Sequence, residues 1–308
     1  MSLYGLLAGK GASGFGYGST AAEVTEDISL AGLRMLVTGC NSGIGQETLR
    51  VLALRGARVI GTARTLEKAE RACAAVGGQT LPLACELSDP ASVLACVQAV
   101  KQAGAQLDAI VCNAGIMALP ELQKAHGYEL QFFTNHVGHF MLVTGLLAEL
   151  SELGRVVVVS SSAHRQAPRT GIEFENLDGS KGYSPWTAYG QSKFANLVFA
   201  KELARRLAGS KQTANAVHPG VIKTNLQRHM SAPLSVLFNT FGPLALKSTA
   251  EGAATQVYVA THPTLAGISG RYFADCNLAT PRADADDTAL ARRLWETTER
   301  IVAELRAS

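Results

Sequence analysis

A tyrosine and a lysine stand four residues apart in the segment Tyr189-Gly-Gln-Ser-Lys193, downstream of the serine run 160–162. On a helix, side chains with this spacing share one face. The ammonium stabilises a nearby phenolate and lowers the tyrosine pKa from about 10 towards a value that suits acid–base chemistry. When a hydride moves to or from a carbonyl carbon, the oxygen needs such a proton donor, and a serine hydroxyl can hold it. Taken alone, Y-x-x-x-K fits a solvated helix face as well, so other segments must decide.

A glycine-rich turn near the N-terminus is the second chemical signal. The apolar run 35–37 reads as a buried strand that breaks at a glycine and opens onto a helix. Such a helix start offers unpaired N–H groups and the positive end of the helix dipole, which suit a dinucleotide pyrophosphate. The spacing G-x-x-x-G-x-G differs from the usual G-x-G-x-x-G but leaves the same room for phosphates. A strand-to-helix connection without a ligand is the alternative. The candidate contacts are Gly39, Asn41, Ser42, Gly43, Ile44 and Gly45.

The chain beyond residue 30 alternates short apolar runs with helical patterns. Strands are predicted at residues 35–37, 58–62, 80–84, 109–112, 155–160, 213–217 and 270–274. Helices are predicted at residues 45–54, 66–75, 90–103, 128–150, 186–207, 248–261 and 287–305. Continuous apolar runs are typical of strands covered on both faces, and right-handed crossovers join them into a doubly wound sheet. We expect one Rossmann-type α/β domain over residues 31–308, with a parallel seven-stranded sheet and helices on both faces. Residues 1–30 read as a loosely packed, glycine-rich arm.

In such a sheet, ligands lie at the carboxyl ends of the strands. The second predicted strand ends in Ala63 and Arg64. An acid at this place would bind the ribose 2′-hydroxyl of NAD, whereas a basic side chain can hold the 2′-phosphate of NADP. NADP(H) is therefore the favoured cofactor. A solvated charge at a helix start is the alternative for Arg64.

The third and fourth predicted strands also end in candidate cofactor contacts. Glu86, followed by Leu87, could reach the adenine amino group, and Ser88 or Asp89 could cap the next helix. The segment Asn113-Ala114-Gly115 is small enough for the backbone and a cofactor to approach each other. Asn113 fits a structural bridge between neighbouring strands equally well.

These segments occur together in one order and spacing. They are Thr38-Gly39-x-x-x-Gly43-Ile44-Gly45, Asn113-Ala114-Gly115, Ser161, Tyr189-x-x-x-Lys193 and His218-Pro219-Gly220. In this combination the chain resembles the short-chain dehydrogenase/reductase family from about Ala31 to its C-terminus. Within the family it is most similar to the branch of retinol dehydrogenases and WW-domain oxidoreductases, with chloroplast inner-envelope relatives close by. Segments 135–140, 160–164, 189–196, 272–276 and 294–296 carry this closer resemblance.

The resemblance implies roles for individual residues. Tyr189 would be the general acid/base, Lys193 would hold the nicotinamide ribose hydroxyls and tune Tyr189, and Ser161 would orient the carbonyl. Asn135 would help to hold a water of the proton relay. Ser161 is chosen over its neighbours because the family's serine is usually the second of the pair after the strand. The clasp of the nicotinamide amide would comprise Pro219, Gly220, Val221, Ile222 and Thr224.

Three positions depart from the family pattern. Glu86 stands where an aspartate is usual, Val158 where an asparagine is common, and Gln46 where this branch commonly has a basic residue. The first departure weakens the predicted adenine contact, and none touches the catalytic set.

Three histidines invite other interpretations. His136 and His139 lie at i and i+3 on a predicted helix and could bind zinc, but no third ligand is near in sequence, so no metal is expected. His164 after the serines suggests a hydrolase triad, yet the G-x-S-x-G elbow of hydrolases does not occur here. A histidine at the surface or in a substrate loop is the preferred reading of His164.

Segment 225–248 is expected to cover the active site. Its many apolar side chains favour a lipophilic aldehyde or ketone, or the corresponding alcohol, as substrate. The alternative is that they only pack the segment on the body or form a subunit contact. A non-catalytic NADP(H) sensor is the alternative function, against which the intact Ser161, Tyr189 and Lys193 argue. A light-dependent reductase of a pigment precursor is disfavoured, because that branch is expected to lack the serine.

Composition bounds the partners. The 308 residues are 47% hydrophobic with a net charge of +3, too mild to suggest nucleic acid. No stretch approaches the roughly 20 apolar residues of a membrane span, and residues 1–20 hold no apolar run fit for an export signal. The six cysteines, without a C-x-x-C pair, are typical of a reduced cytoplasmic protein. A homo-oligomer is typical of the family, but no sequence feature fixes it.

Overall fold

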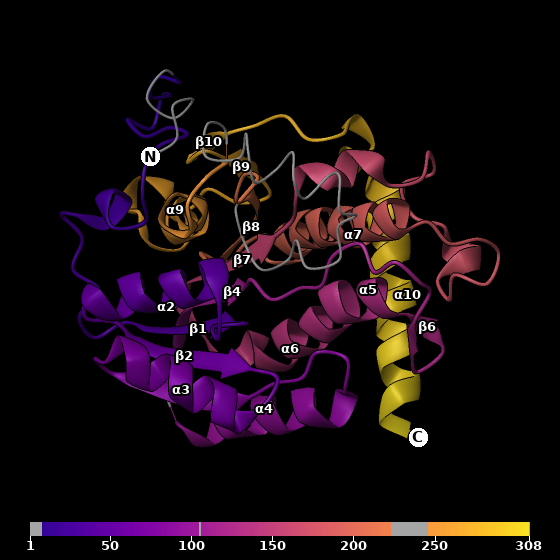
Figure 1. The fold of residues 1–308 in the computed structure, drawn as a ribbon, viewed down its shortest axis with the longest axis horizontal. Helices are drawn as coiled ribbons and strands as arrows, with labels where there is room; N and C mark the ends of the chain where they lie inside the picture. The colour runs from indigo at the N-terminus through magenta and orange to yellow at the C-terminus, as the bar shows by residue number, and fades with distance from the viewer. Residues whose placement is uncertain (1–7, 105, 223–245, 308) are drawn as a thin grey trace.

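An eight-stranded sheet forms the centre of the structure, a computed structural model that describes residues 8–104, 106–222 and 246–307 (Figure 1). The strand order is β10-β9-β8-β7-β4-β1-β2-β3, and all neighbours except β9 and β10 run parallel. The strands are β1 (Arg34–Thr38), β2 (Arg58–Ala63), β3 (Thr80–Ala84), β4 (Leu107–Cys112), β7 (Leu150–Val159), β8 (Thr213–His218), β9 (Tyr272–Ala274) and β10 (Asn277–Leu278). A separate ribbon pairs β5 (Lys124–Ala125) with β6 (Tyr128–Glu129).

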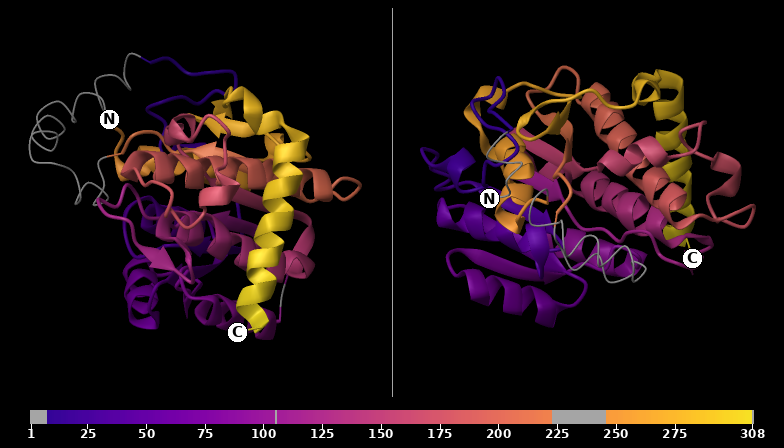
Figure 2. Two further views of the ribbon diagram at one scale, coloured as in Figure 1. Left: turned by 90° about the vertical axis from the view of Figure 1, so that its right-hand side faces the viewer. Right: turned by 45° about the horizontal axis from the view of Figure 1, so that its top comes forward.

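Helices cover both faces of this sheet, as the sequence predicted (Figure 2). The longer ones are α2 (Gly43–Leu54), α3 (Leu66–Val76), α4 (Pro90–Gln102), α6 (Gly138–Leu146), α7 (Pro185–Arg206), α9 (Thr249–Thr261) and α10 (Thr288–Ala307). In β1, Met35 and Val37 join the apolar cluster under α2 and α9, whereas Leu36 joins the cluster under α4, α6 and α7. Successive side chains of a strand point to opposite faces, so an uninterrupted apolar run is what a doubly covered strand requires. Among the described residues, no helix is both long and apolar enough to cross a membrane.

The prediction of seven strands was one strand short. The seven predicted parallel strands are present, and β10 adds an antiparallel eighth. The chain turns between β9 and β10 through Asp275 and Cys276, whose φ angles are 51° and 62°. Two left-handed residues are what a tight two-residue hairpin needs, but they are usually Asn and Gly. Because neither position is glycine or asparagine, the turn carried no recognisable sequence signal.

The long helix predicted at residues 128–150 is divided in the structure. A short helix, α5 (Leu130–Phe132), leads into a π-helical turn, η2 (Phe133–Val137), and then into α6. The end of the predicted range instead forms a 3-10 turn, η3 (Leu147–Glu149), and the start of β7. π-helical turns are rare and concentrate at functional sites, and this one contains Asn135.

The N-terminal arm is attached more firmly than the sequence suggested. Its 3-10 turn η1 (Glu23–Thr25) packs beside α9, and Ala21 donates its N–H to the carbonyl oxygen of Ala250 at 2.9 Å. Arg55 at the end of α2 donates to the carbonyl oxygen of Ala22 at 2.9 Å. The arm thus bridges two helices on one face of the sheet.

The last helix, α10, runs along α7 at one side of the molecule (Figure 1; Figure 2). The indole of Trp295 lies against Phe140 of α6 and Phe199 of α7, with ring centroids 4.8 Å and 5.8 Å apart. The guanidinium of Arg206 lies 4.1 Å from the centroid of the Trp295 ring. The outer faces of α6 and α7 are therefore buried within the chain.

Three short 3-10 turns lie in connections between β7 and α10 along the chain. They are η4 (Ser162–Gln166), η5 (Phe174–Asn176) and η8 (Ala283–Asp286), and a further turn, η7 (Pro263–Leu265), follows α9.

Candidate active site

Helix α7 places Tyr189 and Lys193 on its buried face, at the carboxyl ends of β4 and β7. Pro185 at the start of the helix needs no N–H partner, so the helix begins just before the pair. Both side chains are buried. The Lys193 ammonium donates to the carbonyl oxygen of Val159 at 3.0 Å and lies 5.9 Å from the centroid of the Tyr189 ring. The end of β7 therefore holds the lysine beside the tyrosine.

The serine run separates into three different environments. Ser160 is buried and donates to the carbonyl oxygen of Lys193 at 2.7 Å, so it braces the helix. Ser161 precedes η4, where its Oγ accepts the N–H of Ala163 at 3.2 Å, and its hydroxyl lies near enough to Tyr189 to lower the pKa of that tyrosine. Ser162 is exposed. Of the three hydroxyls, Ser161 is the one that meets the tyrosine.

The charge states of the pair differ from the sequence prediction that Lys193 lowers the tyrosine pKa. Burial raises the pKa of Tyr189 to about 12, and the hydrogen bond from Ser161 offsets this only in part. Burial also lowers the pKa of Lys193 from 10.5 to about 8. Desolvation thus outweighs the attraction between the two groups. Near neutral pH, Tyr189 holds its proton and Lys193 is charged, which is the state of a proton donor.

Asn135 lies directly across from this pair. Its side chain accepts the N–H of Ile116 at 2.8 Å and donates to the carbonyl oxygen of Ile116 and to Ser192 Oγ, each at 2.9 Å. A Cβ added at Gly115 would lie 3.0 Å from Asn135 Oδ1 and 3.3 Å from Lys193 Nζ. The structure therefore brings Asn135, Ser161, Tyr189 and Lys193 together, and the absence of a side chain at Gly115 keeps the space between them open.

A buried histidine, His139, which the sequence analysis weighed only as a zinc ligand, links this group to the glycine turn. Thr38 Oγ1 accepts the N–H groups of Asn113 and Ala114, so its own hydrogen points to His139 Nε2 at 2.9 Å. His139 Nδ1 then donates to the carbonyl oxygen of Asn135 at 2.9 Å. Burial lowers the pKa of His139 to about 4, so the ring stays neutral. Only its spacing of four residues from Asn135 could have signalled this contact.

The glycine turn joins β1 to α2 as predicted. Gly39 has a φ of 72°, and Ser42 precedes the helix without capping it through its side chain. A Cβ at Gly45 would lie 2.2 Å from the carbonyl oxygen of Gly39 and 2.5 Å from Asn113 Nδ2. Helix α2 therefore starts against the ends of the strands. Its first backbone N–H groups, those of Gly43 and Ile44 among them, are directed over the turn that contains Asn41. This donor set fits a dinucleotide pyrophosphate.

Two predicted cofactor contacts are already engaged within the protein. Asn113 Nδ2 donates to the carbonyl oxygen of Thr38 at 2.8 Å, and Asn113 Oδ1 accepts from Gln256 at 3.2 Å, so its side chain is the structural bridge considered above. Glu86 Oε1 accepts the N–H and the hydroxyl of Ser88, while Asp89 caps α4. Ala114, Gly115 and Leu87 border the same edge of the sheet.

Beyond the glycine turn, an open cavity of about 220 Å³ lies between α2 and α3. Its lining is Asn41, Gln46, Lys68, Arg71 and Ala72. Arg64 follows β2 and is exposed next to the start of α3. Sequence reasoning found Arg64 but missed Lys68 and Arg71, although their spacing along α3 places both on one face. Arg71 pairs with Glu67 at 2.5 Å, so Lys68 is the better lining candidate for holding an added phosphate, and Arg64 lies outside the lining.

The predicted clasp follows β8. Val221 is exposed, and its carbonyl oxygen accepts the N–H of Lys247 at 2.9 Å, while Ile222 forms a parallel bridge with Lys247. Pro219 and Gly220 form the turn, in which Gly220 has a φ of 91°. Thr224 lies outside the described residues, as does most of segment 225–248. Residues 247 and 248 of that segment belong instead to the bridge and to the cap of α9.

The histidines considered as metal ligands have other partners. His136 Nε2 lies 3.0 Å from Thr298 Oγ1, whereas His139 contacts Thr38 and Asn135. Within residues 8–104, 106–222 and 246–307, no group of three or more His, Cys, Asp or Glu side chains could hold a metal ion. His164 accepts the N–H of Arg282 through Nε2 and lies within 2.6 Å of the Ser161 carbonyl oxygen through Nδ1, so it supports the serine loop rather than the serine hydroxyl.

Comparison with known proteins finds matches over most of this chain. A family model described as short chain dehydrogenase matches residues 34–234. The chloroplastic short-chain dehydrogenase TIC 32 B of Brassica napus is 40% identical over 99% of this chain and 100% of its own length. Retinol dehydrogenase 14 of Mus musculus is 39% identical over 89% of this chain and 87% of its own length.

Solved structures show the same fold. An uncharacterized protein from Mycobacterium paratuberculosis superposes with a TM-score of 0.74 at 34% identity, covering 93% of this chain and 98% of its own. A short chain dehydrogenase from Burkholderia cenocepacia in complex with NADP gives a TM-score of 0.65 at 26% identity, covering 80% of this chain and 96% of its own.

Proposed function

Because this chain belongs to the short-chain dehydrogenase/reductase family, we propose that it is an NADP(H)-dependent oxidoreductase that acts on a lipophilic aldehyde or ketone or on the corresponding alcohol. The observation that carries the proposal is the buried pair of Tyr189 and Lys193 on α7, with the Lys193 ammonium held at the end of β7 next to the serine run. A non-catalytic nucleotide sensor, the alternative function, has no need for such a pair.

The side chains divide the chemistry as follows. When bound, the nicotinamide nucleotide supplies or accepts the hydride. Tyr189 donates its proton to the carbonyl oxygen during reduction, because its raised pKa keeps it protonated at neutral pH. Ser161 holds the same oxygen through its hydroxyl. Lys193, charged below about pH 8, stabilises the phenolate that forms. Asn135 keeps the loop at Ile116 in place beside them.

The preference for NADP(H) rests on charged side chains at the end of the site where the adenosine ribose of the cofactor would lie. Ala63 leaves no acid to bind a ribose 2′-hydroxyl, Lys68 lines the cavity in which a 2′-phosphate would lie, and the exposed Arg64 follows β2. The solved structure of the Burkholderia cenocepacia short chain dehydrogenase is a complex with NADP, which supports the same choice for this chain.

The wild-type protein tests this proposal directly. NADPH and NADH are titrated by nucleotide fluorescence, and oxidation of each is then followed with a panel of apolar aldehydes and ketones. We expect tighter binding of NADPH and turnover of at least one carbonyl. Tight NADPH binding without turnover across a broad panel would favour the sensor instead.

Removing the cationic side chains near the cavity should weaken discrimination between the cofactors. Charge-assisted hydrogen bonds contribute about 1.5–3 kcal/mol, so Arg64→Ala or Lys68→Ala should lower the ratio of kcat/KM for NADPH to that for NADH by about 10- to 100-fold. Steady-state kinetics with both cofactors measure the ratio. Arg58→Ala is the matched control. Arg58 lies at the amino-terminal end of β2, opposite to the end at Ala63, and its side chain donates a hydrogen bond to Gln79 Oε1. An unchanged ratio in both cavity variants would contradict the assignment.

Support for a lipophilic substrate comes from exposed apolar side chains beside Tyr189. Trp186 lies one turn earlier on α7, 40% exposed, with its ring centroid 6.2 Å from that of Tyr189. Val221 of the clasp is 49% exposed. An apolar wall near the proton donor would favour substrates with apolar surface. The apolar segment 225–248, on which the sequence prediction rested, lies almost entirely outside the described residues.

The cytoplasmic location stays a proposal. All six cysteines are free and buried, which fits a reducing compartment. The relative in Brassica napus is named a chloroplastic protein, and the name refers to that relative alone.

A further inference from the structure

We propose that the N-terminal arm positions the nicotinamide clasp, and that Tyr17 and Lys247 transmit this effect. The inference rests on the proposed function, because it assigns a role to residues behind the predicted clasp. Neither residue was singled out by the sequence analysis.

The clasp lies against the stem of Lys247. A Cβ added at Gly220 would stand 2.7 Å from Lys247 Cδ and 2.9 Å from Cε, so the lysine chain lies directly on the glycine backbone. The backbone N–H of Lys247 also donates to the carbonyl oxygen of Val221. Any sideways movement of Lys247 therefore moves the surface on which the turn rests.

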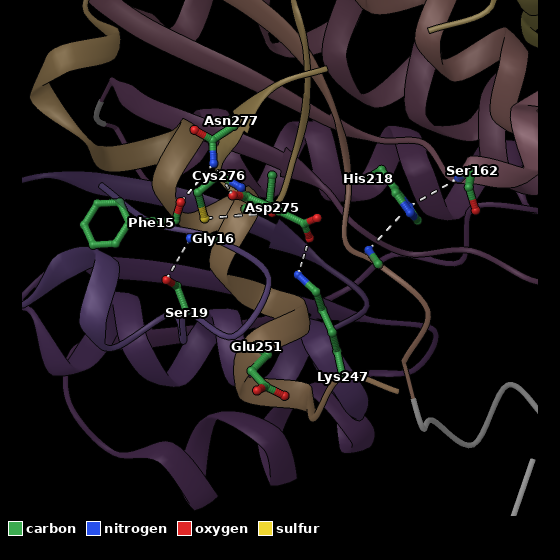
Figure 3. Close-up of polar contacts among 12 residues, drawn as sticks. Phe15, Gly16, Ser19, Ser162, His218, Lys247, Glu251, Asp275, Cys276 and Asn277 are labelled. Atoms are coloured by element: carbon green, nitrogen blue, oxygen red, sulfur yellow. Dashed lines mark hydrogen bonds and ion pairs between the residues drawn. The ribbon is translucent and has the colours of Figure 1, made fainter. Parts of the chain in front are cut away.

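The charged end of Lys247 is fixed by two groups from distant parts of the chain. Its ammonium forms an ion pair with Asp275 Oδ1 at 2.6 Å in the β9–β10 turn (Figure 3). It also lies 4.6 Å from the centroid of the Tyr17 ring in the arm. Lys247 is only 1% exposed, and a buried ammonium keeps its position when its charge is satisfied on both sides.

The arm is held at the same turn. Asn277 Oδ1 accepts the N–H of Ser13 at 3.0 Å. The Asn277 amide donates to the carbonyl oxygen of Phe15 at 3.0 Å (Figure 3). The Phe15 ring packs edge-on against Tyr258 of α9. Tyr17 is therefore held on a fixed support, two residues from Phe15.

The opposite side of the clasp is attached to the catalytic serine loop. His218 Nδ1 accepts the N–H of Ser162 at 3.3 Å and that of Gly220 at 3.4 Å (Figure 3). Burial lowers the pKa of His218 to about 4, so the nitrogen remains an acceptor at neutral pH. The clasp is thus held between the serine loop on one side and the Lys247 contacts on the other, and loss of one support should change its position.

The test compares two ligands that share the adenosine end. NADPH reaches the clasp, whereas 2′-phospho-ADP-ribose lacks the nicotinamide and does not. We expect Tyr17→Leu to raise the Kd for NADPH by about fivefold and to lower kcat, with the Kd for 2′-phospho-ADP-ribose unchanged. Tyr17→Phe keeps the ring beside the ammonium and should therefore bind NADPH more tightly than Tyr17→Leu does. Asp275→Asn, which removes the other support while keeping the side-chain shape, should shift NADPH binding in the same direction.

The outcomes separate this inference from the proposed function. If the wild type fails to bind NADPH, the proposed function falls and the inference falls with it. If the wild type binds NADPH and both Tyr17→Leu and Asp275→Asn bind it equally well, only the role of the arm is overturned. A parallel loss for both ligands would mean general damage to the fold and would also overturn it.

Discussion

Tyr189→Phe should lower kcat for carbonyl reduction by about 10²- to 10⁴-fold, the usual contribution of a positioned proton donor. The ring remains in its buried place, and only the hydroxyl that meets Ser161 is lost. Because that hydroxyl acts on the substrate oxygen rather than on the nucleotide, the Kd for NADPH should stay within about twofold of the wild type. Steady-state kinetics and fluorescence titration on one preparation measure both quantities.

Tyr128→Phe is the matched control for this variant. Tyr128 is also partly buried and stacks on Phe133, but its element, β6, belongs to the small ribbon outside the main sheet. Its kcat should match that of the wild type. Full turnover by Tyr189→Phe would refute the proton-donor role and would revive the nucleotide sensor.

Gly45→Ala should abolish tight nucleotide binding and destabilise the protein. The added methyl group would lie 2.2 Å from a backbone oxygen, which cannot move away as a flexible side chain can. Overpacking of this kind costs about 1–3 kcal/mol of unfolding free energy. If the turn shifts to relieve it, two or more phosphate contacts are lost, so the Kd for NADPH should rise about 100-fold. Urea denaturation and fluorescence titration measure the two effects.

Gly9→Ala supplies the comparison, because no atom lies within 4 Å of a Cβ at that position. It should leave both quantities close to those of the wild type. If Gly45→Ala bound NADPH as tightly as Gly9→Ala does, the turn between β1 and α2 could not be the phosphate site.

The parallel part of the fold could be predicted because its signals are local. Apolar runs such as residues 35–37 are covered on both faces, and alternating strands and helices favour parallel pairing through right-handed crossovers. The hairpin at Asp275 could not be predicted, since its left-handed residues are not of the types that usually signal such a turn. The π-helical turn around Asn135 was also missed, because the Asn135 side chain bonds to Ile116, a partner that only tertiary packing brings there.

Within the site, the sequence predicted which residues meet but not their electrostatics. Spacing on a helix places Lys193 near Tyr189, yet it cannot report how deeply the pair is buried, and burial decides the direction of the tyrosine pKa. Lys68 and Lys247 had no motif around them. Their surroundings, a cavity between two helices and a turn far along the chain, exist only after folding.

The helix α10 has a consequence for assembly. It packs along α7, and its Trp295 ring lies against Phe140 of α6 and Phe199 of α7. A second copy could pair through that surface only by displacing α10, which would return several large apolar side chains to water at about 1.5–3 kcal/mol each. The C-terminal helix therefore covers, within one chain, a side of α7 that a neighbouring subunit could otherwise fill.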